Sequence, residues 1–263
     1  MDPLTILAAI AAGAAIGFVL GLVGGGGSIL AVPLLVYVVG VSDPHVAIGT
    51  AAVAVALNAL SGLVGHARSG NVKWPCALVF AAAGMAGAAI GAEAGKAFDG
   101  QRLLALFGVL MIAVGALMLR RRRGGEAPDV RLTRDSAPYL LRRLVPLGLA
   151  VGLLAGFFGI GGGFLIVPGL IAATAMPIGV AVGSSLVAVS ALGATTAASY
   201  AVSGLVDWLL IAWLAAGGVA GSVAGRSVGS SLATRKRLLE SGFAVLVIMV
   251  GLFVAAKGLD AFV

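Results

Sequence analysis

Two glycine-rich segments, each embedded in a long apolar run, constrain this fold more than any other feature of the sequence. Residues 21–33 read Gly-Leu-Val-Gly-Gly-Gly-Gly-Ser-Ile-Leu-Ala-Val-Pro, and residues 156–168 read Gly-Phe-Phe-Gly-Ile-Gly-Gly-Gly-Phe-Leu-Ile-Val-Pro. Each glycine destabilises a helix by about 1 kcal/mol relative to alanine, so both segments predict helix breaks. Inside a bilayer, broken backbone is tolerated only where it is buried in protein or lines a cavity.

The composition places these breaks in a membrane. Of the 263 residues, 60% are hydrophobic and only 10% are charged, a balance that excludes a soluble domain. The net charge of +7 comes from basic residues in short loops between apolar runs, which is typical of topology signals and not of nucleic-acid binding. The single cysteine, Cys76, excludes an internal disulfide and a multi-cysteine metal site, and we expect neither a metal nor a cofactor. No basic stretch precedes the first apolar run, so we expect that run to be retained and not cleaved.

The chain consists of two similar halves at an offset of about 134 residues. Ser69-Gly70 followed by Trp74 corresponds to Ser203-Gly204 followed by Trp208, and the glycine-rich segments correspond in the same way. We therefore predict a first repeat at 1–119, a basic linker at 120–143 and a second repeat at 144–263. The apolar runs lie at about 4–40, 46–66, 74–95 and 102–119 in the first repeat, and at 144–175, 180–202, 208–229 and 238–256 in the second.

The charge distribution favours repeats of opposite orientation. A membrane span needs about 20 apolar residues, so the run 4–40 predicts a helix, a break, and a shorter helix from Ser28 that returns to the starting side. Three further crossings per repeat then turn the second repeat upside down. This arrangement puts 14 of the 17 basic residues in the cytoplasm, whereas eight single spans would put 11 there. The three cytoplasmic loops would be 67–73, 120–143 and 226–237.

The predicted fold is therefore an all-α polytopic membrane protein of two inverted-topology repeats, each a Gly-broken helical hairpin plus three transmembrane helices. We expect it to be a multi-pass protein of a bacterial-type inner (plasma) membrane, with the linker 120–143 in the cytoplasm and both termini outside. The lipid bilayer is then its obligatory partner, and nucleic acid is not a partner.

The paired breaks predict a binding site for a small anion. A helix that restarts after a break presents unpaired N–H groups and the positive end of its dipole, which is a ready anion site. We expect these helices to begin near Ser28, a good N-cap residue, and near Gly163 or Phe164. No arginine or lysine is predicted at that depth. The alternative is that the glycines only permit tight crossings or a turn. The candidate site residues at the breaks are Gly24, Gly25, Gly26, Gly27, Ser28, Gly159, Gly161, Gly162 and Gly163.

Polar residues inside apolar runs are further candidates, because an unpaired polar group is costly in hydrocarbon. The candidate donors to the anion are Thr50, Asn58, Ser184 and Ser185. The alternative is that hydroxyls bond carbonyls one turn back, which we expect for Ser190, Thr195 and Thr196. His66 and Glu93 are the ionisable candidates for proton coupling, and the alternatives are an interfacial histidine and a glutamate that reaches the surface with Lys96.

Small-residue stripes predict close helix packing. Gly87, Gly91 and Gly95 recur at four-residue spacing, as do Gly221, Gly225 and Gly229. We expect them to pack the two repeats together, and a homodimer through the same faces is the alternative. Trp74, Trp208 and Trp213 are expected to start segments as interfacial anchors.

These motifs resemble those of the TauE/SafE sulfite exporter family. The resemblance rests on the Gly-rich break followed by proline, the helix starts Gly49-Thr50 and Gly183-Ser184-Ser185, and the Ser-Gly-x-Val-x-Trp segments, all duplicated. It implies a secondary transporter that exports a small sulfur-containing anion, such as sulfite or sulfoacetate, and binds it at these motifs. In the first repeat Ser28 replaces the last glycine, so the two halves of the site differ.

The sequence leaves two other functions to compare with transport. A channel for a small anion or neutral solute on the same scaffold is the alternative. An intramembrane hydrolase is disfavoured, because both histidines lie near segment ends and no Gly-x-Ser-x-Gly motif occurs. We therefore expect no enzyme activity and no catalytic residues.

Overall fold

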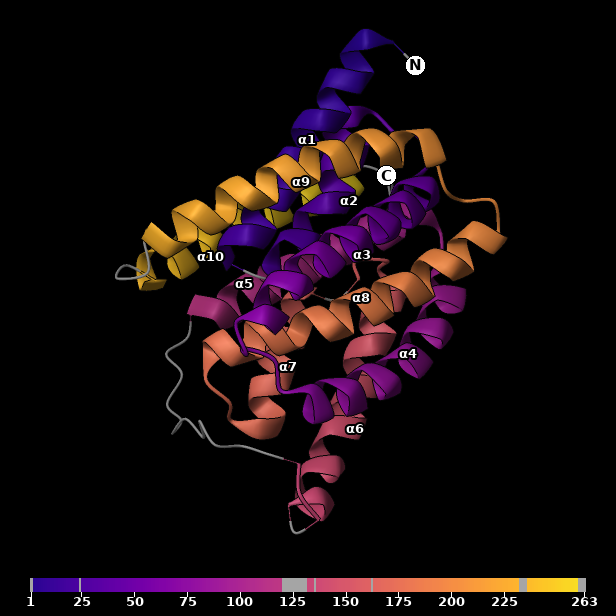
Figure 1. Cartoon of the computed structure of the whole chain (residues 1–263). Helices are drawn as coiled ribbons and strands as arrows, with labels where there is room; N and C mark the ends of the chain where they lie inside the picture. The colour runs from indigo at the N-terminus through magenta and orange to yellow at the C-terminus, as the bar shows by residue number, and fades with distance from the viewer. Residues whose placement is uncertain are drawn as a thin grey trace.

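The computed structural model describes residues 2–23, 25–119, 132–134, 136–161, 163–231 and 236–259, and it is helical throughout these ranges except for short connections (Figure 1). The first half contains α1 (Pro3–Val23), the 3₁₀ helix η1 (Gly25–Leu30), α2 (Ala31–Leu34), the π-helix η2 (Leu35–Val39), α3 (Pro44–Arg68), α4 (Trp74–Lys96) and α5 (Gly100–Leu119). The second half contains α6 (Ala137–Phe157), α7 (Gly163–Thr174), α8 (Ile178–Val202), α9 (Trp208–Ser231) and α10 (Lys236–Leu259). In the described ranges, eight helices are long and apolar enough to cross a membrane. The predicted all-α polytopic membrane fold is thereby confirmed.

Each of the two longest apolar runs forms a full-length helix followed by a short one, as predicted. The short helices span Gly26–Val39 and Gly163–Thr174. A Cβ added to Gly27 would lie 2.6 Å from the carbonyl oxygen of Ile16 in α1, and η2 also packs on α1. In the second half, α7 packs back on α6. Each pair is therefore a hairpin whose second arm is shorter than the first.

The corresponding helices α3 and α8 end in matching caps, and α3 also has a side-chain cap at its start. The Asp43 carboxylate accepts a hydrogen bond of 2.8 Å from the His45 N–H at the start of α3, and Pro44 occupies the first turn. Helices α3 and α8 both end at a glycine in the left-handed region, Gly70 (φ +70°) and Gly204 (φ +71°). The duplicated Ser-Gly sequence thus encodes the same turn twice.

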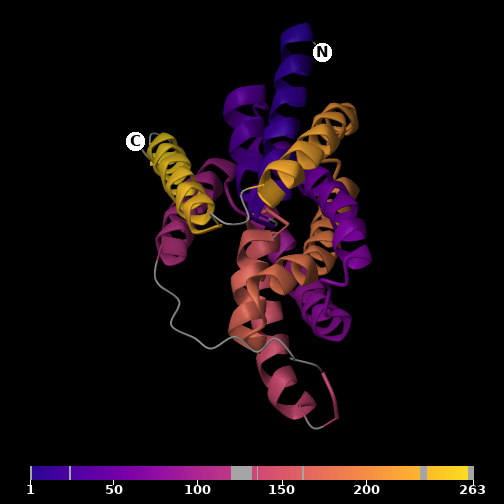
Figure 2. The ribbon, with the colours of Figure 1, turned by 60° about the vertical axis from the view of Figure 1, so that its left-hand side comes forward.

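Helices from different halves pack directly on one another. Helix α1 lies along α9, α4 along α6, α3 along α8 and α5 along α10, and Figure 2 shows α5 and α10 side by side at one edge of the molecule. Bare backbone makes this possible, because Gly17 of α1 faces the Gly218 carbonyl of α9, and Gly91 of α4 faces the Leu153 carbonyl of α6. The expectation that the glycine stripes join the two halves is confirmed.

Two of these pairs run antiparallel. Gly49, near the start of α3, lies against Tyr200, near the end of α8, whereas Gly183, near the start of α8, lies against Asn71, just beyond α3. Helix α5 meets α10 in the same reversed sense, with Gly108 against Ala255 and Gly115 against Ile248. The first turns of α1 and α6 lie at opposite ends of the molecule in both views (Figures 1 and 2).

Three expectations need correction. Ser28 is not an N-cap, because helical geometry resumes at Gly25 and Ser28 lies inside η1. A 3₁₀ helix can form here because it eclipses positions i and i+3, and the glycines have no side chains that would clash there. The end of the predicted linker is helical, because α6 begins at Ala137 with Pro138 in its first turn. Trp213 lies inside α9 and does not start it, and its indole nitrogen is buried. The linker arginines Arg120, Arg121, Arg122, Arg123 and Arg131, and the glycines Gly24 and Gly162, lie outside the described residues.

Candidate substrate site at the helix breaks

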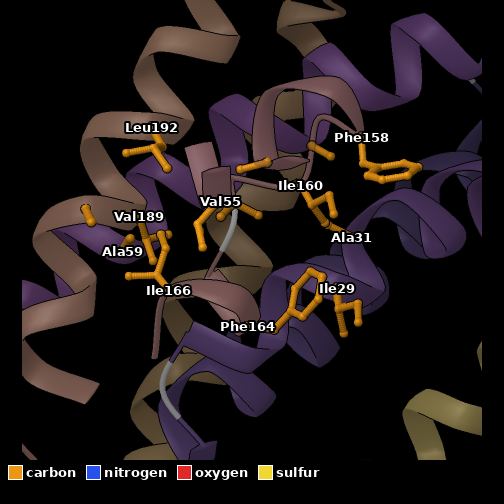
Figure 3. Packing of buried hydrophobic residues seen from close by; sticks show 14 of the residues in the cluster. Ile29, Ala31, Val55, Ala59, Phe158, Ile160, Phe164, Ile166, Val189 and Leu192 are labelled. Atoms are coloured by element: carbon orange, nitrogen blue, oxygen red, sulfur yellow. The ribbon is translucent and has the colours of Figure 1, made fainter. Parts of the chain in front are cut away.

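The two broken segments meet in the interior of the bundle. η1 and α7 pack against each other, and both also contact α8. Figure 3 shows Ile29 from η1 and Phe164 from α7 in one buried cluster, together with Val55 of α3 and Val189 of α8. Ile29 is fully buried and Phe164 is 4% exposed. The chain therefore brings together, from opposite halves, the two segments that the sequence singled out.

The break after α6 has a defined backbone geometry. Gly159 adopts φ +67°, the Ile160 N–H donates to the Ala155 carbonyl (3.1 Å), and the Gly159 N–H donates to the Gly156 carbonyl (3.1 Å). This is the Schellman termination of a helix, which requires a residue that tolerates the left-handed region. A Cβ on Gly159 would also overlap the Ile48 side chain of α3. Two independent constraints thus require glycine at position 159: the left-handed φ and the lack of space for a side chain.

The restart of helix geometry follows at once. Gly161 adopts φ +62°, and a Cβ placed on it would lie 3.1 Å from Val55 Cγ1 of α3 and 3.7 Å from the Gly193 Cα of α8. Helix α7 begins at Gly163, as predicted, and Gly163 is buried. The first N–H groups of a helix have no partner within that helix. The start of α7, which also packs on α8, therefore presents main-chain donors in the protein interior.

The surroundings of the breaks are electrically neutral. Across the part of the chain that the structure describes, every buried polar side chain is uncharged. Main-chain N–H groups, hydroxyls and amides are therefore the donors that the interior offers to a negative solute. The buried polar side chains are Ser28, Thr50, Asn58, Thr174, Ser184, Ser185, Ser190, Thr196 and Ser222.

The buried members of the predicted site at the breaks are Gly26, Gly27, Ser28, Gly159, Gly161 and Gly163. Ser28 is fully buried, and Gly26 and Gly27 lie beside it in η1. Gly25 opens η1. The structure thus brings the glycines of the first break to within contact of α7, the element that follows the second break.

Thr50 and Ser184 instead make a pair of reciprocal hydrogen bonds between the halves. Thr50 Oγ1 accepts the Asp207 N–H at 3.0 Å, and Ser184 Oγ accepts the Lys73 N–H at 2.9 Å. Thr50 corresponds to Ser184 and Lys73 corresponds to Asp207 in the repeat. Each hydroxyl accepts a hydrogen bond from the residue that precedes a helix of the other half. This helix is α9 for Thr50 and α4 for Ser184. Their observed role is to join the halves.

The other hydroxyls mostly bond their own helix. Ser185 Oγ donates to the Val182 carbonyl at 2.7 Å. The same own-helix pattern, expected for Ser190 and Thr195, is confirmed at 2.8 and 2.9 Å. For Thr196 the expectation is wrong, because its Oγ1 is buried with no hydrogen-bond partner in the described residues. The remaining candidate, Asn58, is buried against Gly218 of α9.

The two ionisable candidates lie near helix ends. His66 is in the last turn of α3, beside Gly183 of α8. Glu93 is in the last turns of α4, forms an ion pair of 2.8 Å with Lys96, and is 68% exposed. Sequence reasoning missed the partners of this pair on α8, although Ser199 and Ser203 recur there at the four-residue spacing of one helix face.

This is the architecture of a multi-pass membrane transporter. It combines a membrane-spanning bundle, two short helices that meet inside the bundle, and an uncharged interior. The chain belongs to the sulfite exporter TauE/SafE family, whose model matches residues 9–254. It is therefore a transporter and not an enzyme, in agreement with the sequence analysis.

Similar proteins carry transporter names. A probable membrane transporter protein of Xylella fastidiosa is 46% identical over 250 residues, which cover 95% of each chain. The probable membrane transporter protein YunE of Bacillus subtilis is 32% identical over 72% of this chain and 75% of its own, and MJ0441 of Methanocaldococcus jannaschii is 27% identical over 58% of each. No solved structure matches the chain.

Proposed function

We propose that this chain is a secondary transporter that exports a small sulfur-containing oxyanion, such as sulfite or sulfoacetate, and binds it at the two helix breaks. The observation that carries the proposal is the contact between η1 and α7 inside an uncharged interior. The name of the family, sulfite exporter, supports this substrate class.

Main-chain amides hold the anion in this mechanism. The first turn of α7, entered through Gly161 and Gly163, offers N–H donors and the positive end of a helix dipole. The low dielectric of the interior strengthens that attraction. Because no fixed cation is buried among the described residues, the anion is not held by a permanent ion pair and is released when the site opens.

The two halves act as inverted repeats that alternate the access of this site. The antiparallel packing of α3 on α8 and of α5 on α10 supports the inversion, as does the placement of the first turns of α1 and α6 at opposite ends. Rocking of one repeat against the other around a central site is the usual consequence of this symmetry. The basic linker faces the cytoplasm and both termini face outward.

Coupling to an ion gradient completes the mechanism. His66 and Glu93 are the ionisable residues assigned to proton coupling. One of the two substitutions His66→Ala and Glu93→Gln, each of which introduces a neutral residue, should remove the dependence of flux on the pH gradient. The residue whose replacement does so is the one that carries the proton.

Flux measurement in proteoliposomes tests the proposal. Purified protein is expected to give saturable flux of radiolabelled sulfite or sulfoacetate, and the flux should change when a pH gradient is imposed. Absence of flux for both anions in both conditions refutes the assignment. Flux that does not saturate, or single-channel currents across a planar bilayer, identifies a channel instead.

A further inference from the structure

A charged network ties the end of α4 to the end of α8. Lys96 Nζ lies 2.8 Å from Glu93 Oε1 and donates to Ser203 Oγ (2.8 Å) and to the Ser199 carbonyl (3.2 Å). Ser199 Oγ in turn donates to Glu93 Oε1 at 2.8 Å. An ammonium has three donors, and all three are engaged here. We refer to these four residues as the α4–α8 latch.

The two charged residues of the latch are not repeated in the sequence of the other half. In the repeat, Ser227 stands where Glu93 does and Gly65 stands where Ser199 does, while Lys96 corresponds to a serine. Ser227 Oγ donates to the Val223 carbonyl of its own helix at 3.1 Å. The ion pair of the latch is thus formed by residues that the other half does not repeat.

Next to the latch, α8 carries a buried hydroxyl that has no partner among the described residues. Leu192 of α8 packs on Gly84 of α4. A Cβ added to Gly84 would lie 2.7 Å from Leu192 Cδ1. Thr196 lies between Leu192 and Ser199 on the same face of α8, at four- and three-residue spacing. Its Oγ1 is buried, and within the described residues it has no hydrogen-bond partner.

Tyr200 adds a second such hydroxyl. Its side chain is fully buried, its phenolic oxygen finds no partner in the described part of the chain, and Lys96 Nζ lies 5.9 Å from its ring centroid. Buried hydroxyls are normally paired because an unpaired one is costly. Helix α8 thus carries two such hydroxyls within two turns of the latch, and the Tyr200 side chain also packs against Gly49 of α3.

We propose that the α4–α8 seam is one mouth of the transport path, closed by the latch and lined by the hydroxyls of Thr196 and Tyr200, which donate hydrogen bonds to the passing oxyanion. Separation of α8 from α4 frees Lys96 from Ser199 and Ser203 and presents its charge to anions at the entrance. The identity of the solute rests on the proposed function, whereas the opening of the seam does not.

Cysteine accessibility tests the opening without any substrate. The single native cysteine is removed (Cys76→Ala), and Thr196→Cys becomes the probe for a charged, membrane-impermeant maleimide on protein in lipid nanodiscs. With the latch intact, labelling is slow. Lys96→Met removes the ammonium, and labelling should become about tenfold faster, as expected for loss of charge-assisted hydrogen bonds.

Two controls separate opening from loosening. Lys257→Met makes the same substitution at an exposed site in the last turn of α10 and should leave the labelling rate unchanged. Ala181→Cys, a fully buried probe near the opposite end of α8, should stay slow when Lys96→Met is present. Ser199→Ala, a smaller change that removes only the hydroxyl bond to Glu93, should give a smaller acceleration.

The outcomes are decisive in both directions. Faster labelling of Thr196→Cys alone supports the mouth. An unchanged rate in both Lys96→Met and Ser199→Ala, or an equal acceleration at Ala181→Cys, overturns it. If no sulfur oxyanion is transported but the seam opens as described, the proposed substrate is wrong and the mouth stands.

Discussion

Gly161→Ala, compared with Gly204→Ala, isolates the role of the second helix break. Both glycines adopt a left-handed φ, +62° and +71°, which disfavours alanine by about 1–2 kcal/mol. A Cβ at Gly204 meets nothing within 4 Å, and one at Gly161 meets Val55 Cγ1 at 3.1 Å, a small further strain. Each variant should therefore lower the melting temperature by a similar amount, about 2–8 °C.

The two variants should differ in transport. Relief of strain at Gly161 rotates the peptide groups that lead into α7, and loss of one N–H hydrogen bond to an anion weakens binding by about 1.5–3 kcal/mol, or about 10- to 150-fold. Gly204 lies in the turn between α8 and α9, so its variant should transport normally. Sulfite flux in proteoliposomes, normalised to folded protein, measures this. Equal flux from the two variants refutes a site at the break.

Three further predictions concern the scaffold. Ser184→Ala leaves the Lys73 N–H without its acceptor and should destabilise the protein by about 1–3 kcal/mol in thermal denaturation, whereas Ser184→Thr should be close to neutral. Gly91→Val places a side chain against the α6 backbone and should abolish monodisperse elution in size-exclusion chromatography, whereas Gly179→Ala, which meets nothing within 4 Å, should elute normally. Cys76 is 1% exposed and should react with an impermeant maleimide only after denaturation; rapid labelling of native protein would contradict its burial.

Most of the fold was predictable because hydrophobic length and duplication are encoded locally. The run 208–229 matches α9 to within two residues, and the glycine stripe at Gly87, Gly91 and Gly95 correctly indicated where α4 meets the other half. The start of α6 was not predictable from hydropathy, because Arg142 and Arg143 are exposed on a helix surface and appear as loop residues in an apolar count.

The site was predictable in its backbone and less so in its side chains. A glycine cluster directly predicts a break in the helix. The new helix α7, which begins at Gly163, confirms this prediction. Whether a hydroxyl faces a ligand depends on tertiary neighbours, and Thr50 turned out to accept the Asp207 N–H across the repeat interface. The partner of Glu93 on α8, Ser199, was missed because no local pattern links residues so distant in sequence.

The placement of α1 along α9 and of α4 along α6 has a consequence for biosynthesis. The bare face of α1, around Gly13 and Gly17, has no partner until α9, the last helix but one, leaves the ribosome. Until then the nascent chain presents this surface to lipid or to the insertion machinery. Assembly must therefore follow translation and cannot proceed half by half, and a chain cut in the linker should regain its native form only when both fragments are made in the same membrane.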